Sequence, residues 1–253
     1  MNGDIVVVRP ASGLSGDMML AGFARLAGAD DAALAALAVG LGLPGDCIAV
    51  EPRSLNAIGG WGARVTLPRE HAHRTLADVR AVMAASTLSP AARDFAERTF
   101  VLLAEAEGRV HGIAPDAVTF HEVGALDSIL DICLVSALFA EMAPARFVSG
   151  PLPLCDGTVR CAHGLLPAPA PAVLEMLEGV AVCGIETRGE TVTPTAIALL
   201  KGLGADFGGW PAMRVERRAL IYGSRVLPGV ANGAIFARGP AEAQSPAPHH
   251  HHH

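Results

Sequence analysis

The sequence predicts an α+β fold, with mixed α and β elements arranged as layered sheets covered by helices. The early segments run in the order strand, helix, helix, strand, strand, helix, which does not suit a purely parallel, doubly wound sheet. Hydrophobic residues make up 51% of the 253 residues and charged residues only 17%, so the chain can bury a large core.

Apolar periodicity and turn residues place each element along the chain. In order, they predict strand 5–8, helices 18–27 and 31–39, strands 47–53 and 61–67 joined by a turn at Gly59 and Gly60, helices 75–85 and 89–110, strand 118–120, helices 126–142, 171–177 and 194–203, and strands 213–222 and 230–237. Three helix starts carry a hydroxyl N-cap or a proline at the first position, at Thr75, Ser89-Pro90 and Thr193-Pro194.

The composition also limits the class of protein. With few charges and a net charge of −6, nucleic-acid binding is not expected. No apolar run reaches the ~18 residues needed to cross a bilayer, and the N-terminus lacks the features of a secretion signal. The five cysteines show no regular spacing. We therefore expect a cytoplasmic protein with reduced thiols and no contact with a membrane.

Residues 1–238 are expected to form one α/β domain, with an internal division near 68–74 or 112–118 as the alternative. His249 to His253 resembles an expression tag, and the small, polar, proline-containing residues 239–248 predict a disordered tail.

The turn at 10–17 is a candidate anion site. A buried strand, a turn rich in glycine and serine, and a helix N-terminus together expose free backbone N–H groups. Ser12, Gly13, Ser15 and Gly16 suit a phosphate sterically, and Asp17 suits a metal that accompanies it. The alternative is that Ser15 or Asp17 is an ordinary N-cap. Because no lysine follows the glycines, the turn is not a P-loop.

The densest group of reactive side chains runs from Thr119 to Asp131 and includes His121, Glu122 and Asp127. Asp127 and Asp131 are four positions apart on the expected helix, where their repulsion costs about 0.2–0.5 kcal/mol. An acidic pair beside a His-Glu pair suits a divalent cation or an acid–base centre. His121, Glu122 and Asp127 are therefore candidate catalytic residues, and His121 and Asp127 are also candidate metal ligands. The alternative is that Asp127 or its neighbour only caps the helix and that Asp131 is solvated.

Three further groups add candidates. His71 and His73 would project to one side of an extended segment and form a His-x-His metal pair, with Arg74 beside them for an anion. The alternative is a loop with solvated histidines. His163 belongs with Cys155 and Cys161 to a loose group of soft ligands, which lacks the tight CxxC spacing of structural zinc. Thr193 and Thr195 begin a helix and offer a second anion site, or simply its N-cap.

Seven separated motifs together resemble one family. They are PASGLSGDM at 10–18, HAHR at 71–74 with Leu76 and Asp78, FHEVGALDS at 120–128, PLPL at 151–154, CAHGLLPAPAP at 161–171, VTPT at 192–195 and IYG at 221–223. In identity and order they are similar to the LarC family, the nickel insertion proteins of nickel-pincer nucleotide biosynthesis. The resemblance spans nearly the whole native chain.

The resemblance implies a lyase-class reaction in which nickel enters a pyridinium bis-thiocarboxylic acid mononucleotide through one carbon–nickel and two sulfur–nickel bonds. It also implies use of CTP and of a divalent metal such as Mg²⁺ or Mn²⁺. Family members hold CTP in a second domain, whereas this chain resembles the N-terminal domain alone. CTP is therefore expected only through a second domain or a separate C-terminal-type polypeptide. Because the family often oligomerises, a homo-oligomer is also left open.

Two other functions fit the same residues. One is a diverged metal-dependent lyase or hydrolase that acts on a small phosphorylated or carboxylated substrate. The other is a non-catalytic subunit that binds the precursor and presents it to a partner. Nickel that co-purifies with the protein favours nickel insertion, whereas zinc, manganese or magnesium favours the lyase or hydrolase. Binding of the precursor without turnover favours the non-catalytic subunit.

Overall fold

The computed structural model describes residues 3–67, 74–120, 125–161 and 164–242. Its helices are α1 (Gly16–Ala27), α2 (Asp31–Gly40), α3 (Leu76–Ala85), α4 (Pro90–His111), α5 (Leu126–Met142), α6 (Pro171–Met176) and α7 (Pro194–Gly202). Its strands are β1 (Asp4–Pro10), β2 (Ile48–Leu55), β3 (Ile58–Val65), β4 (Arg74–Thr75), β5 (Thr119–Phe120), β6 (Arg146–Ser149), β7 (Leu152–Cys155), β8 (Thr158–Cys161), β9 (Gly164–Pro167), β10 (Val182–Ile185), β11 (Asp206–Phe207), β12 (Arg217–Ile221) and β13 (Ala234–Pro240).

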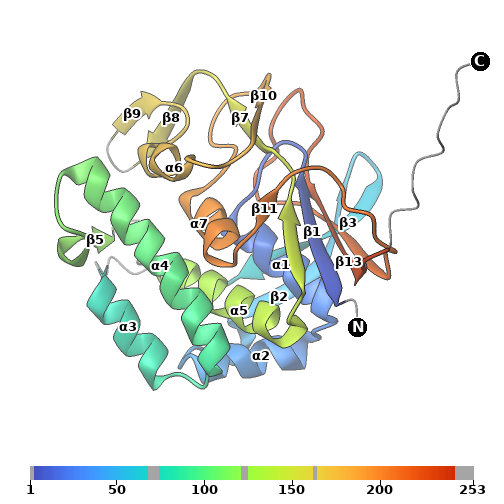
Figure 1. The fold of residues 1–253 in the computed structure, drawn as a ribbon, viewed down its shortest axis with the longest axis horizontal. Coiled ribbons are helices and arrows are strands. Elements are labelled where there is room, and N and C mark those ends of the chain that lie inside the picture. Colours follow the sequence, from blue (N-terminus) through green and yellow to red (C-terminus); the bar gives the residue numbers. More distant parts are fainter. Residues whose placement is uncertain (1–2, 68–73, 121–124, 162–163, 243–253) are drawn as a thin grey trace, which may run out of the picture.

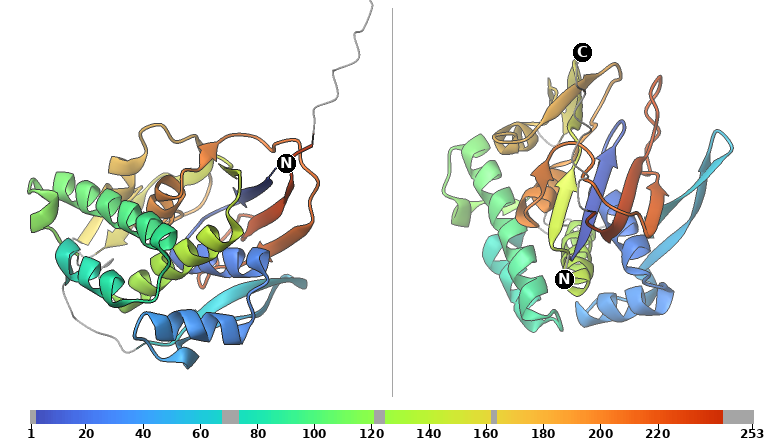
Figure 2. Two further views of the ribbon diagram at one scale, coloured as in Figure 1. Left: turned by 60° about the horizontal axis from the view of Figure 1, so that its bottom comes forward. Right: turned by 45° about the vertical axis from the view of Figure 1, so that its right-hand side comes forward.

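A mixed sheet of seven strands, in the order β11-β6-β1-β13-β12-β3-β2, is the largest sheet in the described residues. Three two-stranded sheets accompany it there, β10-β7, β4-β5 and β8-β9. The helices gather on one side of the large sheet (Figures 1 and 2). The predicted α+β class is therefore confirmed. None of the helices in the described ranges combines the length and apolar character needed to cross a bilayer.

Helix α1 is central to the packing because two of its sides are covered. It contacts β3, β12 and β13 of the sheet on one side and α5 on another. The ring of Phe23 is fully buried, with the ring centroids of Phe139, Phe147 and Phe236 at 5.8, 5.7 and 6.2 Å. Burial of such a side chain is worth roughly 1.5–3 kcal/mol. These contacts fix the N-terminus of α1 at the end of β1.

The predicted helix starts at Thr75, Ser89 and Thr193 are confirmed. Each hydroxyl accepts a hydrogen bond from the backbone N–H three residues later. At Thr75 the carboxylate of Asp78 also accepts from the Thr75 N–H at 2.8 Å, which completes a capping box. Local side-chain chemistry therefore determines where these helices begin.

The hairpin of β2 and β3 turns at a different place from the prediction. Its turn lies at Asn56 and Ala57, whose φ angles are 51° and 62°, while Gly59 and Gly60 lie inside β3. Gly60 is required there by packing, because a Cβ would lie 2.7 Å from the ring of Tyr222. Gly60 therefore serves the packing of the strand, no heavy atom lies within 4 Å of a Cβ at Gly59, and the turn forms without either glycine.

The last strand extends beyond the expected end of the domain at residue 238. β13 continues because Gly239 and Pro240 pair with Ile5 and Asp4 of β1. The backbone N–H of Glu242 then donates to the Ala212 carbonyl at 3.0 Å. The segment predicted to be a tail is thus part of the fold through residue 242.

Candidate functional site

The turn at residues 12–17 joins β1 to α1 and lies against the segment that precedes α7. The Leu14 N–H donates to the Thr191 carbonyl at 2.8 Å, and the Thr193 N–H donates to the Leu14 carbonyl at 3.1 Å. Gly13 allows this close contact, because a Cβ there would lie 2.5 Å from the Thr191 carbonyl oxygen. The two predicted anion sites are therefore neighbours in space.

A pocket of about 300 Å³ opens beside this turn. Its walls come from the turn, the β2–β3 hairpin, the segment before α7 and the loop between β12 and β13. Hydroxyls, two arginines, one carboxylate and one amide supply its polar groups. The polar side chains are those of Ser12, Ser15, Arg53, Ser54, Glu190, Thr191, Thr193, Tyr222, Ser224, Arg225 and Asn232.

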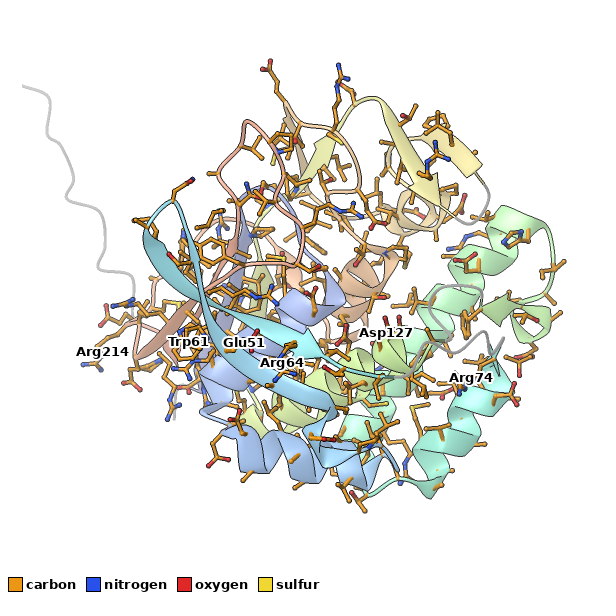
Figure 3. The ribbon with its side chains drawn as sticks, turned by 180° about the vertical axis from the view of Figure 1, so that it is seen from behind. Glu51, Trp61, Arg64, Arg74, Asp127 and Arg214 are labelled. Atoms are coloured by element: carbon orange, nitrogen blue, oxygen red, sulfur yellow. The ribbon has the colours of Figure 1, made fainter. Side chains whose placement is uncertain are left out.

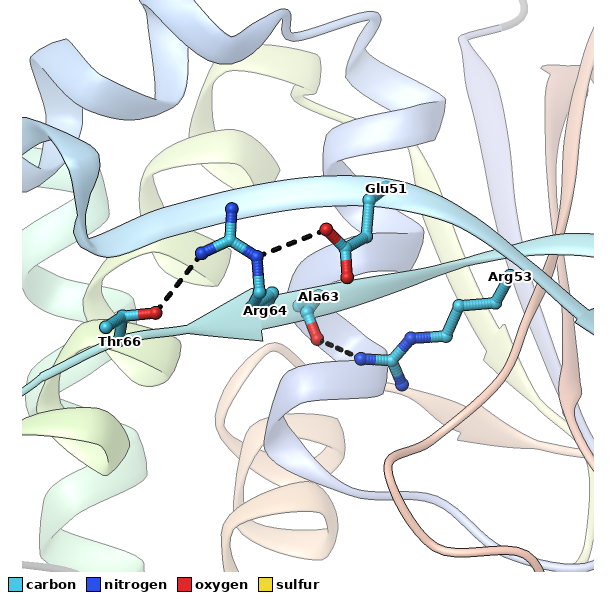
Figure 4. A network of polar contacts seen from close by, with 5 residues as sticks. All are labelled: Glu51, Arg53, Ala63, Arg64 and Thr66. Carbon is cyan, nitrogen blue, oxygen red and sulfur yellow. Dashed lines mark hydrogen bonds and ion pairs between the residues drawn. The ribbon is translucent and has the colours of Figure 1, made fainter.

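Arg53 on β2 forms part of the pocket wall. Its guanidinium crosses β3 and donates to the carbonyl oxygens of Ala63 at 2.6 Å and Tyr222 at 3.3 Å. Figure 4 shows the bond to Ala63. Gly62 makes the crossing possible, because a Cβ there would lie 2.3 Å from Arg53 Nε. The hairpin thus delivers a fixed positive charge to the pocket.

The first turn of α1 is open to an anion, whereas that of α7 is already capped. Ser15 stands at the N-cap position of α1, but its hydroxyl donates to the Asp17 carboxylate and caps no backbone N–H. Side-chain capping would normally satisfy one of these N–H groups. At α7 the Thr193 hydroxyl accepts from the Ala196 N–H at 3.3 Å, and Pro194 has no N–H. The turn before α1 is therefore the better candidate for an anion site of the two.

Asp131 on α5 is buried beside the same turn, which rules out the alternative that Asp131 is solvated. Its exposed fraction is 8%, and among the described residues its Oδ1 has no hydrogen-bond partner. Burial raises the pKa of Asp131 well above its usual value, and the charges of Asp17 and Asp127 raise this pKa further. Gly16 allows the approach, because a Cβ there would lie 2.5 Å from Asp131 Oδ2 and 2.9 Å from Thr195 Cγ2. We call Asp17, Asp127 and Asp131 the carboxylate cluster.

The pocket and the carboxylate cluster meet at Ser15 and Asp17. Ser15 lines the pocket, and its hydroxyl donates to Asp17. A buried carboxyl oxygen without a partner costs about 1–3 kcal/mol, which a bound cation would offset. Within the described ranges, however, no three side chains of His, Cys, Asp or Glu are grouped closely enough to hold a metal ion. The carboxylate cluster alone is therefore not a complete metal site.

Strands β4 and β5 bring together two parts of the chain that adjoin predicted metal ligands. Arg74 on β4 pairs with Phe120 on β5. In the sequence, His73 directly precedes β4 and His121 directly follows β5. In the view of Figure 3, Arg74 and Asp127 both lie to the right of the β2–β3 hairpin. The pairing therefore places Arg74 and Phe120, the sequence neighbours of His73 and His121, opposite each other.

The predicted site residues fall into several groups. Those that line the pocket are Ser12, Gly13, Ser15 and Thr193. Those that lie beside Asp131 are Gly16, Asp17, Asp127 and Thr195. Arg74 lies on β4 and is not among the residues that line the pocket. Those outside the described residues are His71, His73, His121, Glu122 and His163, whose roles stay predictions.

The sequence analysis missed Arg53 and Arg225, and it did not include Asp131 among the candidate site residues. Arg53 reaches the pocket only because β2 pairs with β3, and Arg225 only because its loop folds back toward α1. Neither has a local sequence signal. Asp131 does have one, because it is an acid within the otherwise apolar face of a long helix.

Comparison with known proteins shows extensive similarity. Residues 6–247 match the family model described as nickel insertion protein. A Nocardioides protein named pyridinium-3,5-bisthiocarboxylic acid mononucleotide nickel insertion protein is 39% identical over 244 residues, which cover 93% of this chain and 60% of the relative. A Desulfitobacterium hafniense protein of the same name is 36% identical over 215 residues, covering 85% of this chain and 53% of the relative.

A Myxococcus xanthus protein, provisionally named a nickel insertion protein, is 42% identical over 224 residues, covering 87% of this chain and 57% of the relative. The chain spans about half the length of the curated relatives that it matches. No solved structure matches it.

Proposed function

The chain belongs to the nickel insertion protein family, and we propose that it inserts nickel into pyridinium-3,5-bisthiocarboxylic acid mononucleotide, the reaction after which several relatives are named. One observation carries the proposal. A pocket lined by arginines and hydroxyls meets the carboxylate cluster, of which Asp131 is buried, at Ser15 and Asp17. An organic anion and a divalent cation can therefore be held next to each other, as this reaction requires.

We place the mononucleotide in the pocket beside residues 12–17. The pocket volume of about 300 Å³ lies at the lower end of the range for small-ligand pockets, roughly 300–1,000 Å³. The phosphate would rest on the uncapped start of α1, where Ser12, Gly13, Ser15 and Gly16 surround unsatisfied backbone N–H groups. The alternative sites are less suitable. The Thr193 hydroxyl already caps α7, Thr195 is buried, and Arg74 lies outside the pocket lining.

Nickel is a substrate in this scheme and would be received at the carboxylate cluster. Asp131 Oδ1 supports this placement, because it has no hydrogen-bond partner among the described residues, whereas a buried carboxyl oxygen normally has one. Imidazole and carboxylate are suitable nickel ligands. The proposed ligands are Asp17, Asp127, His71, His73, His121 and His163.

The insertion step replaces a ring carbon–hydrogen bond with a carbon–nickel bond. The electron pair of the broken bond remains on carbon and binds nickel, and the proton passes to a base. Each thiocarboxylate supplies one sulfur–nickel bond. We propose His121 or Glu122 as the base. We also propose that Asp127, which is exposed at the start of α5, lies close to the reacting nickel.

The remaining requirements follow from the family. We propose that Mg²⁺ or Mn²⁺ assists the reaction and that CTP is supplied through a second domain or a separate C-terminal-type polypeptide. We further propose that the reaction takes place in the cytoplasm. An assay should therefore be run with and without CTP, the second metal and such a partner.

Replacement of His121 by alanine should reduce product formation by at least about 100-fold, because proton transfer to a positioned base contributes roughly 10²–10⁴ to a rate. The measurement is mass spectrometry of the nickel-containing mononucleotide formed by tag-free protein. His111→Ala is the matched control, since His111 ends α4 and does not line the pocket. Equal yields from His121→Ala and the unmodified protein would rule out His121 as the base. Turnover of small phosphorylated acids with zinc or manganese, but no nickel product, would indicate the diverged lyase or hydrolase.

Gly62→Ala should weaken mononucleotide binding by about 10-fold and lower the free energy of unfolding by about 1–3 kcal/mol, because Arg53 gives up its bonds to the Ala63 and Tyr222 carbonyls. The new Cβ would occupy the place of Arg53 Nε and Cδ, at 2.3 and 2.4 Å, so the flexible side chain must leave the pocket wall. A lost charge-assisted hydrogen bond accounts for an effect of this size. Gly59→Ala is the control on the same strand, because no heavy atom lies within 4 Å of its Cβ position. Equal binding by the two variants, measured by calorimetry, would contradict the role given to Arg53.

A further inference from the structure

We propose that Arg225, on the loop between β12 and β13, binds the phosphate of the mononucleotide together with the turn at residues 12–16. This inference rests on the proposed function. It assigns a binding role to a residue in none of the seven sequence motifs. It also makes Arg225 the residue by which the protein distinguishes the mononucleotide from the corresponding nucleoside.

The Arg225 side chain is available for a ligand. It lines the pocket and is exposed, and it has no hydrogen bond or ion pair with any residue that the structure describes. Arg53, the other pocket arginine, already donates to two backbone carbonyls. A guanidinium carries five N–H donors in a planar fork that matches two phosphate oxygens. Arg225 can therefore offer its full donor set to an anion.

The loop that carries Arg225 is anchored at both ends. At its start, the Tyr222 N–H donates to the Trp61 carbonyl at 2.8 Å, and the Tyr222 hydroxyl donates to the Ile58 carbonyl at 3.1 Å. At its end, the Ala11 N–H donates to the Gly233 carbonyl at 3.1 Å. Within the loop, the Asn232 amide accepts from the Leu227 N–H at 2.8 Å and donates to the Leu227 carbonyl at 2.7 Å. A loop held in this way loses little conformational entropy when a ligand binds.

The same loop lies directly against the start of α1. A Cβ at Gly223 would lie 3.1 Å from Met18 Sδ and 3.9 Å from Ser15 Oγ. Arg225 is thus two residues from a contact with the N-cap residue of α1, where the backbone N–H groups lack a side-chain cap. A helix N-terminus and a guanidinium both favour negative charge. Together they form a site with donors on two sides.

The charges of the pocket agree with this assignment. Among the described residues, the basic and carboxylic side chains that line the pocket are Arg53, Arg225 and Glu190, so two basic groups accompany one acidic group. The hydroxyls of Ser12, Ser15 and Ser224 add donors. A phosphate dianion, with three acceptor oxygens, can use more of these donors than a singly charged carboxylate can. We therefore assign the phosphate, and not a thiocarboxylate, to this end of the pocket.

The test compares two ligands and three proteins by isothermal titration calorimetry. The ligands are the mononucleotide and the nucleoside made from it with a phosphatase. The tag-free proteins are the unmodified chain, Arg225→Ala and Arg188→Ala. Arg188 is the matched control, because it is also exposed but lines a neighbouring hollow together with Asp156 and Thr187. Thermal melts verify that both variants fold.

For Arg225→Ala, the Kd of the mononucleotide should rise about 10–100-fold, as expected when a charged hydrogen-bond donor is removed, while the Kd of the nucleoside stays unchanged. Arg188→Ala should bind both ligands as the unmodified protein does. If Arg225→Ala weakens both ligands equally, or neither, the phosphate assignment is wrong and the proposed function still stands. If the unmodified protein binds no mononucleotide, the proposed function itself fails.

Discussion

Asp131→Asn is expected to stabilise the metal-free protein while weakening its binding of nickel. Asparagine keeps the shape of the side chain but removes a buried ionisable group, and its amide N–H can donate to a neighbouring carboxylate. The free energy of unfolding should rise by about 1–3 kcal/mol at pH 7.5, the usual cost of a buried polar group without a partner. Nickel affinity should fall by about 10–100-fold, as for other groups that support a metal site. Chemical denaturation and nickel titration of tag-free protein measure the two effects.

The stabilisation should increase with pH. The pKa of Asp131 is raised in the folded state by burial and by the charges of Asp17 and Asp127. Above the ordinary value of 3.8, the unfolded chain therefore loses this proton while the folded chain retains it. The folded state then binds more protons, so the free energy of unfolding of the unmodified protein falls as pH rises. The difference between variant and unmodified protein should be small near pH 4 and largest at neutral pH.

Asp127→Asn provides the matched control. Asp127 lies four residues earlier on the same helix and is exposed, so its replacement should change the free energy of unfolding by no more than about 0.5 kcal/mol at any pH. If Asp131→Asn destabilised the protein at neutral pH, Asp131 would have to be a charged and paired group, and the description of the carboxylate cluster would be wrong.

Gly16→Ala is expected to damage both stability and nickel binding. Its Cβ would lie 2.5 Å from Asp131 Oδ2 and 2.9 Å from Thr195 Cγ2, so α1 and α5 must move apart or Asp131 must turn away. Such overpacking costs about 1–3 kcal/mol, more than the gain of helix propensity from Gly to Ala, about 1 kcal/mol at most. Because Asp131 is displaced, nickel affinity should also fall by about 10-fold or more.

Gly22→Ala separates these two consequences. It lies on the same helix, and its Cβ would meet the ring of Phe236 at 2.3 Å, far from the carboxylate cluster. It should destabilise the protein at least as much as Gly16→Ala does. At a temperature where both variants are folded, it should bind nickel as the unmodified protein does. If both variants lost nickel binding equally, the loss would reflect general destabilisation, and Gly16 would have no specific role.

The helices and the central turn could be predicted because their signals are local. Thr75, Ser89 and Thr193 cap the helices that the sequence assigned to them, because an N-cap hydroxyl and the N–H that it binds are only three residues apart. The turn at 12–17 could be predicted between a strand and a helix because its glycines and serines define a local backbone, and its role as an anion site remains our proposal.

The remaining features depend on contacts between distant parts of the chain. Asp131 is buried because α1 packs against α5, and Gly16 has no side chain to prevent that packing. Arg53 belongs to the pocket because β2 pairs with β3 and Gly62 leaves room for its side chain. The loop that carries Arg225 lies against α1 at Gly223, and its start is anchored by hydrogen bonds from Tyr222 to two carbonyls of β3. No pattern of spacing in the sequence contains this information.

The most direct test of the central claim is a titration of nickel into tag-free, metal-free protein with and without the mononucleotide. The tag must be removed because His249 to His253 would bind nickel themselves. If the pocket and the carboxylate cluster form one site, about one nickel ion should bind per protein chain. The mononucleotide should tighten that binding in the unmodified protein but much less in Asp131→Asn. Nickel binding that is no stronger than background, or that responds neither to the mononucleotide nor to Asp131→Asn, would contradict the account.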